Sequence, residues 1–312
     1  MRPQAACLRG RTGEAACLPY LFLVNFRHAC VFIDGENLRH SLCDLFGADF
    51  NPADYLPKQA NWEEFFRYLV TQASSDLRLR TYWYVVEELD FWPYNIDRLL
   101  KQADFITLEK LIRRHKPHAA AMDAIADPSA RRTRVEIIAR DLLKIENAIK
   151  RRFDGWKELQ NGITRKFDSV EFRRAGSIRM NLFTEEFGDE KGVDVKLATD
   201  LLKLAGIYEV AIIVSGDGDY VPAVQAAKDQ GKHVVNVSFL KKSGGVLPGG
   251  ARRLNQAADR AIEVAYDDMK AFMKIGLPVV AADGAGSSML APSPANPMVP
   301  CQPTAVPPGT QK

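Results

Sequence analysis

Cysteine is scarce in this 312-residue sequence, and its five occurrences form no paired pattern. There is no CxxC pair, no histidine cluster accompanies the cysteines, and the count is odd, all of which argues against a disulfide framework or a zinc site. Free thiols in a reducing compartment fit this usage better, so we expect a cytoplasmic protein. The cysteines are Cys7, Cys17, Cys30, Cys43 and Cys301.

Long hydrophobic runs are also absent. No apolar stretch approaches the roughly 20 residues that a membrane-spanning helix needs, so we expect no membrane partner. The stretch LPYLFLV, residues 18–24, follows three arginines in the manner of a signal peptide. Glu14 and Pro19 interrupt that pattern and no small-residue cleavage site follows, so we interpret residues 1–27 as a disordered or misassigned leader.

Net charge is small, because 42 basic residues face 39 acidic ones. This balance predicts only weak attraction to polyanions and does not by itself indicate a nucleic-acid ligand. The hydrophobic fraction of 46% is enough for a substantial core. Residues 276–312 are rich in proline and alanine and almost free of charge, which predicts a disordered tail and leaves one domain at 28–275.

Strand and helix patterns alternate within this domain. Apolar or alternating segments typical of strands separate helical segments, and this order predicts an α/β fold with a mostly parallel sheet covered on both faces. The expected strands are 29–34, 77–88, one or two within 169–183, 208–217 and 232–240. The expected helices are 35–46, 191–206 and 221–231.

Aspartates stand where two of these strands end. Asp34 ends the first strand and Asp217 ends the strand YEVAIIVSGD, so both carboxylates share one edge of the sheet if the strands are neighbours. Asp219 follows two residues later, in a turn that Gly216 and Gly218 release from Cβ constraints. The fourth candidate is Asp194, which heads an apolar helical stripe.

Four carboxylates gathered without a cationic partner would repel one another. A hard divalent cation such as Mg²⁺ or Mn²⁺ would remove that repulsion, because these ions prefer oxygen ligands. Each aspartate taken singly has a simpler explanation, since Asp34 and Asp217 could cap the following helix and Asp194 lies in a favourable first turn.

The segments VFIDGENL, KGVDVKLATDLLKLA and VAIIVSGDGDYVPAVQAAKDQGKHV, in that order, resemble the NYN domain, specifically its LabA-like branch within the PIN-like nuclease superfamily. The resemblance implies a Rossmann-like three-layer α/β/α fold and a metal-dependent endoribonuclease with Mg²⁺ or Mn²⁺. Its metal-binding and catalytic acids would be Asp34, Asp194, Asp217 and Asp219. Asn37 and Ser215, also motif positions, would position water, metal or phosphate.

Two other functions stay open. The chain could be a non-catalytic RNA-binding or regulatory module that keeps the fold, or another Mg²⁺-dependent phosphotransfer enzyme. A Toprim-like site would favour Glu at position 34, and an aspartate-nucleophile phosphatase would place a second Asp where Glu36 stands. Glu36 is expected to face solvent, and the five histidines to have surface or packing roles.

A helical segment inserted at about 95–165 departs from the family pattern. Within 131–159, Val135, Ile138, Leu142, Ile145 and Ile149 form an apolar stripe with heptad spacing. We expect this stripe to pack on the domain or on a helix within 95–116. Dimerisation through this helix is an alternative, as is RNA contact through the basic residues Arg131, Arg132, Arg134, Lys150, Arg151 and Arg152.

Overall fold

The computed structural model describes residues 27–49, 56–249 and 251–275. The expected tail lies outside the described residues, as does the expected leader apart from Arg27. The described part is an eight-stranded sheet in the order β4-β3-β2-β1-β5-β6-β7, with β8 paired to β6. Its strands are β1 His28–Asp34, β2 Leu77–Trp92, β3 Val170–Asn181, β4 Glu186–Lys191, β5 Val210–Val214, β6 His233–Leu240, β7 Val246–Leu247 and β8 Arg260–Val264.

Most strand pairs are parallel. β1 lies at the centre between β2 and β5, and β3, β6 and β8 extend the parallel arrangement, while β4 and β7 add antiparallel edges. All five residues of β5 are buried, as are all but His28 in β1, which is why these segments read as unbroken apolar runs.

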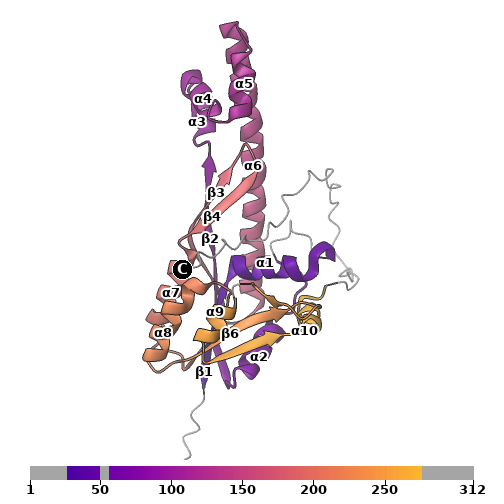
Figure 1. Cartoon of the computed structure of the whole chain (residues 1–312), viewed down its shortest axis with the longest axis vertical. Helices are drawn as coiled ribbons and strands as arrows, with labels where there is room; N and C mark the ends of the chain where they lie inside the picture. Colours follow the sequence, from indigo (N-terminus) through magenta and orange to yellow (C-terminus); the bar gives the residue numbers. More distant parts are fainter. Residues whose placement is uncertain (1–26, 50–55, 250, 276–312) are drawn as a thin grey trace, which may run out of the picture.

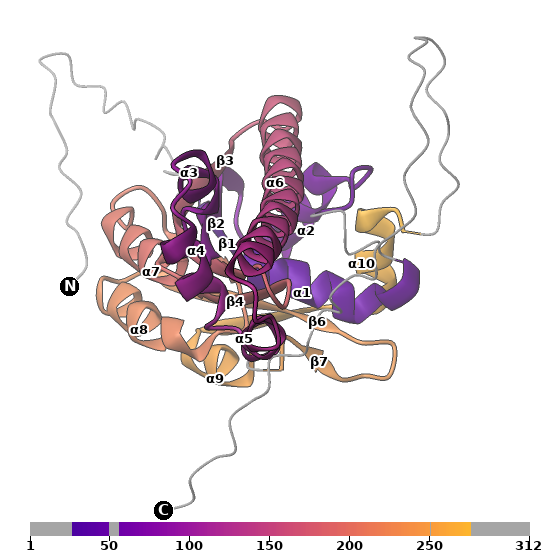
Figure 2. The same ribbon diagram turned by 90° about the horizontal axis from the view of Figure 1, so that it is seen from above.

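Helices cover both faces of the sheet (Figures 1 and 2). One apolar cluster joins Val31 and Ile33 of β1 to helices α1, α2 and α10, and the other joins Phe32 to α7, α8 and α9. This arrangement confirms the predicted three-layer α/β fold. The helices are α1 Gly35–Phe46, α2 Trp62–Gln72, α3 Ile96–Lys101, α4 Phe105–Ile112, α5 Lys116–Asp123, α6 Pro128–Lys166, α7 Val193–Lys203, α8 Val221–Asp229, α9 Ala251–Ala257 and α10 Tyr266–Met273.

The inserted helical segment forms a stalk that projects from the sheet (Figure 1). We define the stalk as helices α3 to α6 with the carboxyl-terminal ends of β2 and β3. It has an apolar cluster of its own, in which Val135, Ile138 and Leu142 of α6 are buried and Ile145 and Ile149 are partly buried. The heptad stripe therefore packs within the chain, on α3 and α4, as expected.

The structure departs from the predicted elements at several places, and α2, α9, α10, β7 and β8 were not predicted. β2 continues to Trp92, beyond the expected end at 88, because it pairs with β3 along its whole outer half. No strand was predicted at 186–191, yet β4 forms there as an antiparallel edge, with the polar sequence EFGDEK. Within the described residues, no helix combines the length and apolar character needed to cross a membrane.

Candidate active site

The two strands that end in acids are neighbours. β1 and β5 pair in parallel, with Ile33 beside Val214, so Asp34 and the SGDGD segment 215–219 leave the sheet at the same edge. This is the carboxyl edge, where α/β sheets bind their ligands. The expectation that Asp34 and Asp217 share one edge is met because β1 lies between β2 and β5.

Asp34 is buried, accepts three hydrogen bonds and lies near a further hydroxyl group. It caps α1 by accepting from the backbone N–H of Asn37 at 3.1 Å, and the Asn37 Nδ2 group donates to its Oδ2 at 2.9 Å. The Ser215 hydroxyl donates to the same oxygen at 3.0 Å and the Tyr220 hydroxyl lies 3.3 Å from it. The capping role considered for Asp34 is therefore real, and it coexists with contacts to the β5 end.

Asn37 and Ser215 hold the two strand ends together. The Asn37 Oδ1 atom accepts from the backbone N–H of Gly216 at 3.2 Å, and the Ser215 Oγ accepts from the N–H of Asp217 at 3.1 Å. Asp217 in turn accepts from the N–H of Asp219 at 2.9 Å and caps the short 3₁₀ turn Gly218–Tyr220. Asn37 and Ser215 thus bond both to the backbone and to the Asp34 carboxylate. The Asp219 side chain is exposed at the border of the site.

Tyr220 links Asp194 to this cluster. Its hydroxyl donates to Asp194 Oδ1 at 2.8 Å, from the first turn of α7, and the same hydroxyl contacts Asp34. The tyrosine is almost fully buried, and its position immediately after SGDGD was the only sequence signal for it. The structure therefore brings Asp34 and Asp194 to one hydroxyl group.

Two glycines allow the backbone to approach closely here. A Cβ on Gly35 would lie 2.4 Å from the carbonyl oxygen of Tyr84, and one on Gly216 would lie 2.5 Å from the Pro248 ring. At Gly218 the nearest atom would be Arg253 Cδ at 3.6 Å, an ordinary contact. Gly216 is thus required for close packing, and Gly218 shows no comparable constraint.

Burial and repulsion raise the pKa values of Asp34 and Asp217. Burial raises the pKa of Asp34 to about 6, and the charge of Asp194 adds to the effect against the hydrogen bonds from Asn37 and Ser215. The pKa of Asp217 is also raised, by burial first and then by the charges of Asp219 and Asp194. The repulsion expected between these carboxylates is therefore present in the folded chain.

Glu190 is an acid of this site that no sequence motif indicated. Burial, then the charges of Glu36, Asp34 and Asp194, raise its pKa to about 9 against the charge of Arg39. Its Oε2 atom is buried without a hydrogen-bond partner. Glu190 lies in the unpredicted strand β4, which is why the strand-end pattern of the aspartates did not include it.

Glu36 also differs from expectation. Its side chain is only 20% exposed and pairs with Arg39 at 2.9 Å. The expectation that it faces solvent is wrong, because the first turn of α1 directs it toward the Glu190 side of the site, where its charge raises the pKa of Glu190.

The carboxylate oxygens of the site are the kind of ligand that divalent cations such as Mg²⁺ and Mn²⁺ prefer. Among these carboxylates, Asp34 and Asp217 have raised pKa values, and Glu190 Oε2 is a buried oxygen without a donor. Within the described residues, however, no three His, Cys, Asp or Glu side chains lie close enough together to hold a metal ion. Ligation by Asp34, Asp194 and Asp217 therefore requires their side chains to turn toward a common point.

The fold and site define a class: an α/β protein with acids collected at the carboxyl edge of a parallel sheet. Residues 136–265 match a family model described as the NYN domain. No curated protein matches the chain. A crystal structure of a protein of unknown function from Vibrio parahaemolyticus has 13% sequence identity and a TM-score of 0.38, covering 77% of this chain and 93% of that one.

Proposed function

We propose that this chain is a metal-dependent endoribonuclease that hydrolyses RNA phosphodiesters. The observation that carries the proposal is the meeting of Asp34, Asp194 and Asp217 at the carboxyl edge, where the charge of Asp194 raises the pKa of both other acids. The NYN match over 136–265 supports it, because NYN domains generally belong to the PIN-like nucleases. The LabA-like branch is part of the same proposal and rests on the motifs of the sequence.

Asp34, Asp194, Asp217 and Asp219 would hold Mg²⁺ or Mn²⁺. Such a cation, when bound, activates water and stabilises negative charge on the leaving oxygen. The chain's own groups set the geometry: Asn37 and Ser215 orient Asp34, and Tyr220 orients Asp194. Arg253 is exposed beside Gly218 and would contact an RNA phosphate.

A non-catalytic RNA-binding module is the second candidate. The observation that favours it is the state of Asp34, whose carboxylate already accepts from three protein donors. A carboxylate so engaged can serve as a structural link between α1 and the β5 end without binding a cation. RNA is the proposed partner in both cases, with the cytoplasm as the proposed location.

Thermal unfolding with Mn²⁺ and with chelator tests the metal site. A ligand that binds only the folded state stabilises it by about 2.7 kcal/mol at a hundredfold excess over Kd. We expect Mn²⁺ to raise the melting temperature of the parent more than that of Asp217→Asn or Asp219→Asn. In chelator these variants should equal or exceed the parent by about 1 kcal/mol, because neutralising one acid relieves repulsion.

Asp229→Asn is the matched control, because Asp229 is exposed at the end of α8 opposite the site and should respond to Mn²⁺ like the parent. Incubation with single-stranded and structured RNA completes the test. Metal-dependent cleavage that disappears in Asp217→Asn supports the nuclease. RNA binding without cleavage, and equal metal responses in all proteins, would instead support the non-catalytic module.

A further inference from the structure

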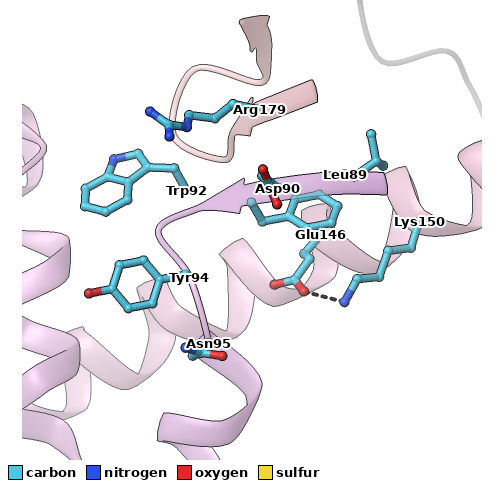
Figure 3. A pocket seen from close by; sticks show the side chains of 9 residues that line it. Leu89, Asp90, Trp92, Tyr94, Asn95, Glu146, Lys150 and Arg179 are labelled. Atoms are coloured by element: carbon cyan, nitrogen blue, oxygen red, sulfur yellow. Dashed lines mark hydrogen bonds and ion pairs between the residues drawn. The ribbon is translucent and has the colours of Figure 1, made fainter. Parts of the chain in front are cut away.

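A pocket of about 570 Å³ lies in the stalk, between the carboxyl-terminal half of β2 and helix α6 (Figure 3). Its volume is within the range of small-ligand sites, about 300 to 1,000 Å³. Its lining includes Asp90, Trp92, Tyr94, Glu146, Lys150 and Arg179.

Two aromatic rings form one side of this pocket. Trp92 and Tyr94 lie 5.8 Å apart between ring centroids, with their planes inclined at 49°, and Figure 3 shows both on the same side. The Tyr94 side chain is exposed to 52% although an aromatic ring of this size favours burial. Arg114 lies over the Trp92 ring at 5.2 Å. An exposed tyrosine beside a tryptophan is a surface on which a flat ring can stack.

The charges of the pocket cancel. Asp90 and Glu146 face Lys150 and Arg179, and the Glu146–Lys150 ion pair closes the side opposite the aromatic rings (Figure 3). A site for phosphate alone would carry an excess of cations. A balanced set of donors and acceptors around aromatic faces suits an uncharged planar group with hydrogen-bonding edges, and a nucleobase is such a group.

The pocket lies farther out along β2 than the acids. Tyr84 of β2 pairs with Asp34, and Trp92 follows eight residues later on the same strand, which is about 26 Å at about 3.3 Å per residue. Glu190 feels the charges of Asp34 and Asp194, so the acids extend part of the way toward the pocket. An RNA strand that contacts both the acids and the pocket must therefore span several nucleotides.

We propose that this pocket is a base-stacking subsite for single-stranded RNA. It holds one unpaired nucleobase of a strand whose backbone passes the acid cluster, with Tyr94 as the exposed stacking surface and Trp92 behind it. This inference rests on the proposed function for the identity of the ligand. A base in a duplex is already stacked and paired, so the subsite selects single strands.

Binding of a labelled single-stranded RNA to the full chain in chelator tests the subsite without cleavage. Stacking on an aromatic side chain contributes enough that its removal weakens binding about 5- to 150-fold. We expect Tyr94→Ala to lose affinity by this factor and Tyr94→Trp to retain it. Ile106→Ala is the matched control, because Ile106 is an apolar stalk residue exposed to 85% and outside the pocket.

A series of RNAs with one abasic nucleotide at successive positions identifies the stacked base. At one position the abasic RNA should bind the parent as weakly as intact RNA binds Tyr94→Ala. Combining this RNA with this variant should weaken binding little further, because both changes remove the same stacking interaction. Additive effects, or equal binding by parent and Tyr94→Ala, would overturn the subsite.

The binding and cleavage measurements together distinguish a failure of the subsite from a failure of the proposed function. If RNA binds as expected but Mn²⁺ gives no cleavage, the nuclease proposal fails and the subsite stands. If cleavage occurs while Tyr94→Ala binds normally, the subsite fails alone. Free mononucleotides that bind as tightly as the RNA, or a parent that binds no RNA, would also overturn the subsite.

Discussion

Tyr220 has one hydroxyl proton and two carboxylates within reach of it. The hydroxyl oxygen lies closer to Asp194, at 2.8 Å, than to Asp34, at 3.3 Å. The raised pKa of Asp34 fits this arrangement, since burial and the Asp194 charge both favour its protonated form. At the scale of single residues, Asp34 and Asp194 therefore compete for one hydroxyl proton.

Tyr220→Phe removes the shared hydroxyl and keeps the buried ring. We expect a decrease of about 1 to 3 kcal/mol in the free energy of unfolding, because buried acceptors lose their donor. Cleavage should fall further than this change in stability explains, because Asp194 is no longer oriented. Urea denaturation and RNA cleavage measure the two effects. Unchanged cleavage in a folded Tyr220→Phe protein would contradict the orienting role.

Glu190 predicts a pH dependence of stability without metal. Folded Glu190 keeps its proton up to about pH 9, whereas its ordinary pKa is 4.5. Between these pH values the folded state binds more protons than the unfolded state. The contribution of Glu190 to the free energy of unfolding is therefore full below pH 4.5 and is lost as the pH rises through 9. The slope is at most about 1.4 kcal/mol per pH unit.

We expect Glu190→Gln to flatten this slope between pH 5 and 9, measured by urea denaturation in chelator. Asp189→Asn is the control, because Asp189 is the exposed neighbour of Glu190 on β4 and should leave the slope unchanged. Parallel pH profiles for the parent and Glu190→Gln would show that Glu190 is ionised in the folded protein.

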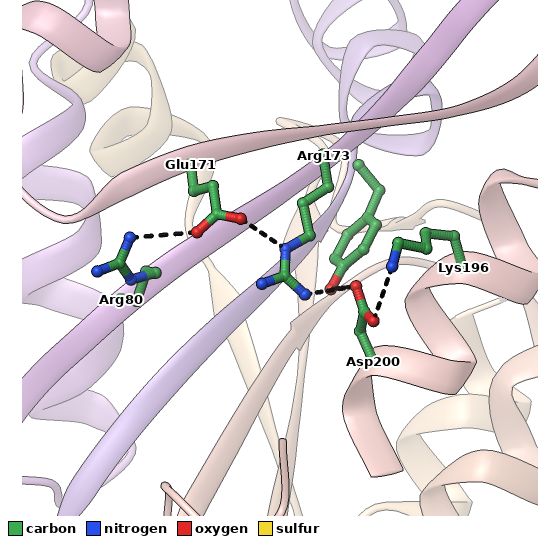
Figure 4. A network of polar contacts seen from close by, with 6 residues as sticks. Arg80, Glu171, Arg173, Lys196 and Asp200 are labelled. Atoms are coloured by element: carbon green, nitrogen blue, oxygen red, sulfur yellow. Dashed lines mark hydrogen bonds and ion pairs between the residues drawn. The ribbon is translucent and has the colours of Figure 1, made fainter. Parts of the chain in front are cut away.

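At the scale of elements, a polar network fastens α7 to the sheet (Figure 4). Asp200 of α7 is buried and accepts from Arg173 of β3, from Lys196 and from the Tyr84 hydroxyl of β2. Burial alone would raise the pKa of Asp200, but Arg173 and Lys196 hold it below its usual value. Since α7 also carries Asp194, this network positions one acid of the site.

Asp200→Ala leaves Arg173 with Glu171 as its remaining carboxylate partner and leaves the buried Tyr84 hydroxyl without its acceptor. We expect a decrease of about 1 to 3 kcal/mol in the free energy of unfolding, because a buried donor that loses its acceptor is left unsatisfied. Asp141→Ala is the matched control, since its pair with Lys144 is exposed and such pairs contribute about 0 to 1 kcal/mol. Chemical denaturation of both variants measures the difference, and similar small decreases would show that the network is weak.

At the scale of the whole molecule, the basic residues of α6 that were considered for RNA contact lie in two groups. Its 39 residues span about 58 Å. Near its start, Arg131 donates to the Ile125 carbonyl and Arg132 lies over the Phe105 ring, so both stabilise the stalk. Farther along, Arg151 and Arg152 are exposed. RNA contact and dimerisation through α6 both stay predictions, although the apolar stripe is already used within the chain.

We expect Arg151→Gln with Arg152→Gln to weaken RNA binding and to reduce the slope of log affinity against log salt by about 0.7 for each phosphate that is no longer neutralised. Arg131→Gln with Arg132→Gln is the matched pair and should leave this slope unchanged, because these residues serve the stalk. Titrations at several salt concentrations measure both. Equal slopes in all three proteins would assign these charges to solvated faces of the helix.

Local patterns in the chain were enough to predict much of this protein. Apolar runs bounded by turns predicted β1, β5 and β6, because strands buried on both faces need unbroken apolar sequence. Helical patterns predicted α1, α7 and α8. The heptad spacing predicted the α6 stripe. Aspartates at strand ends indicated Asp34 and Asp217, since parallel strands bring their carboxyl ends to one edge.

The sequence by itself thus determined the α/β layers, the stripe of α6 and the edge at which the aspartates gather. Only the tertiary structure decided that Glu190 and Tyr220 join them, that Asp219 remains at the border, and that a pocket forms between β2 and α6. The reason is physical. Apolar periodicity records which side of an element is buried, whereas contacts of a polar edge strand or a shared hydroxyl depend on which distant elements become neighbours.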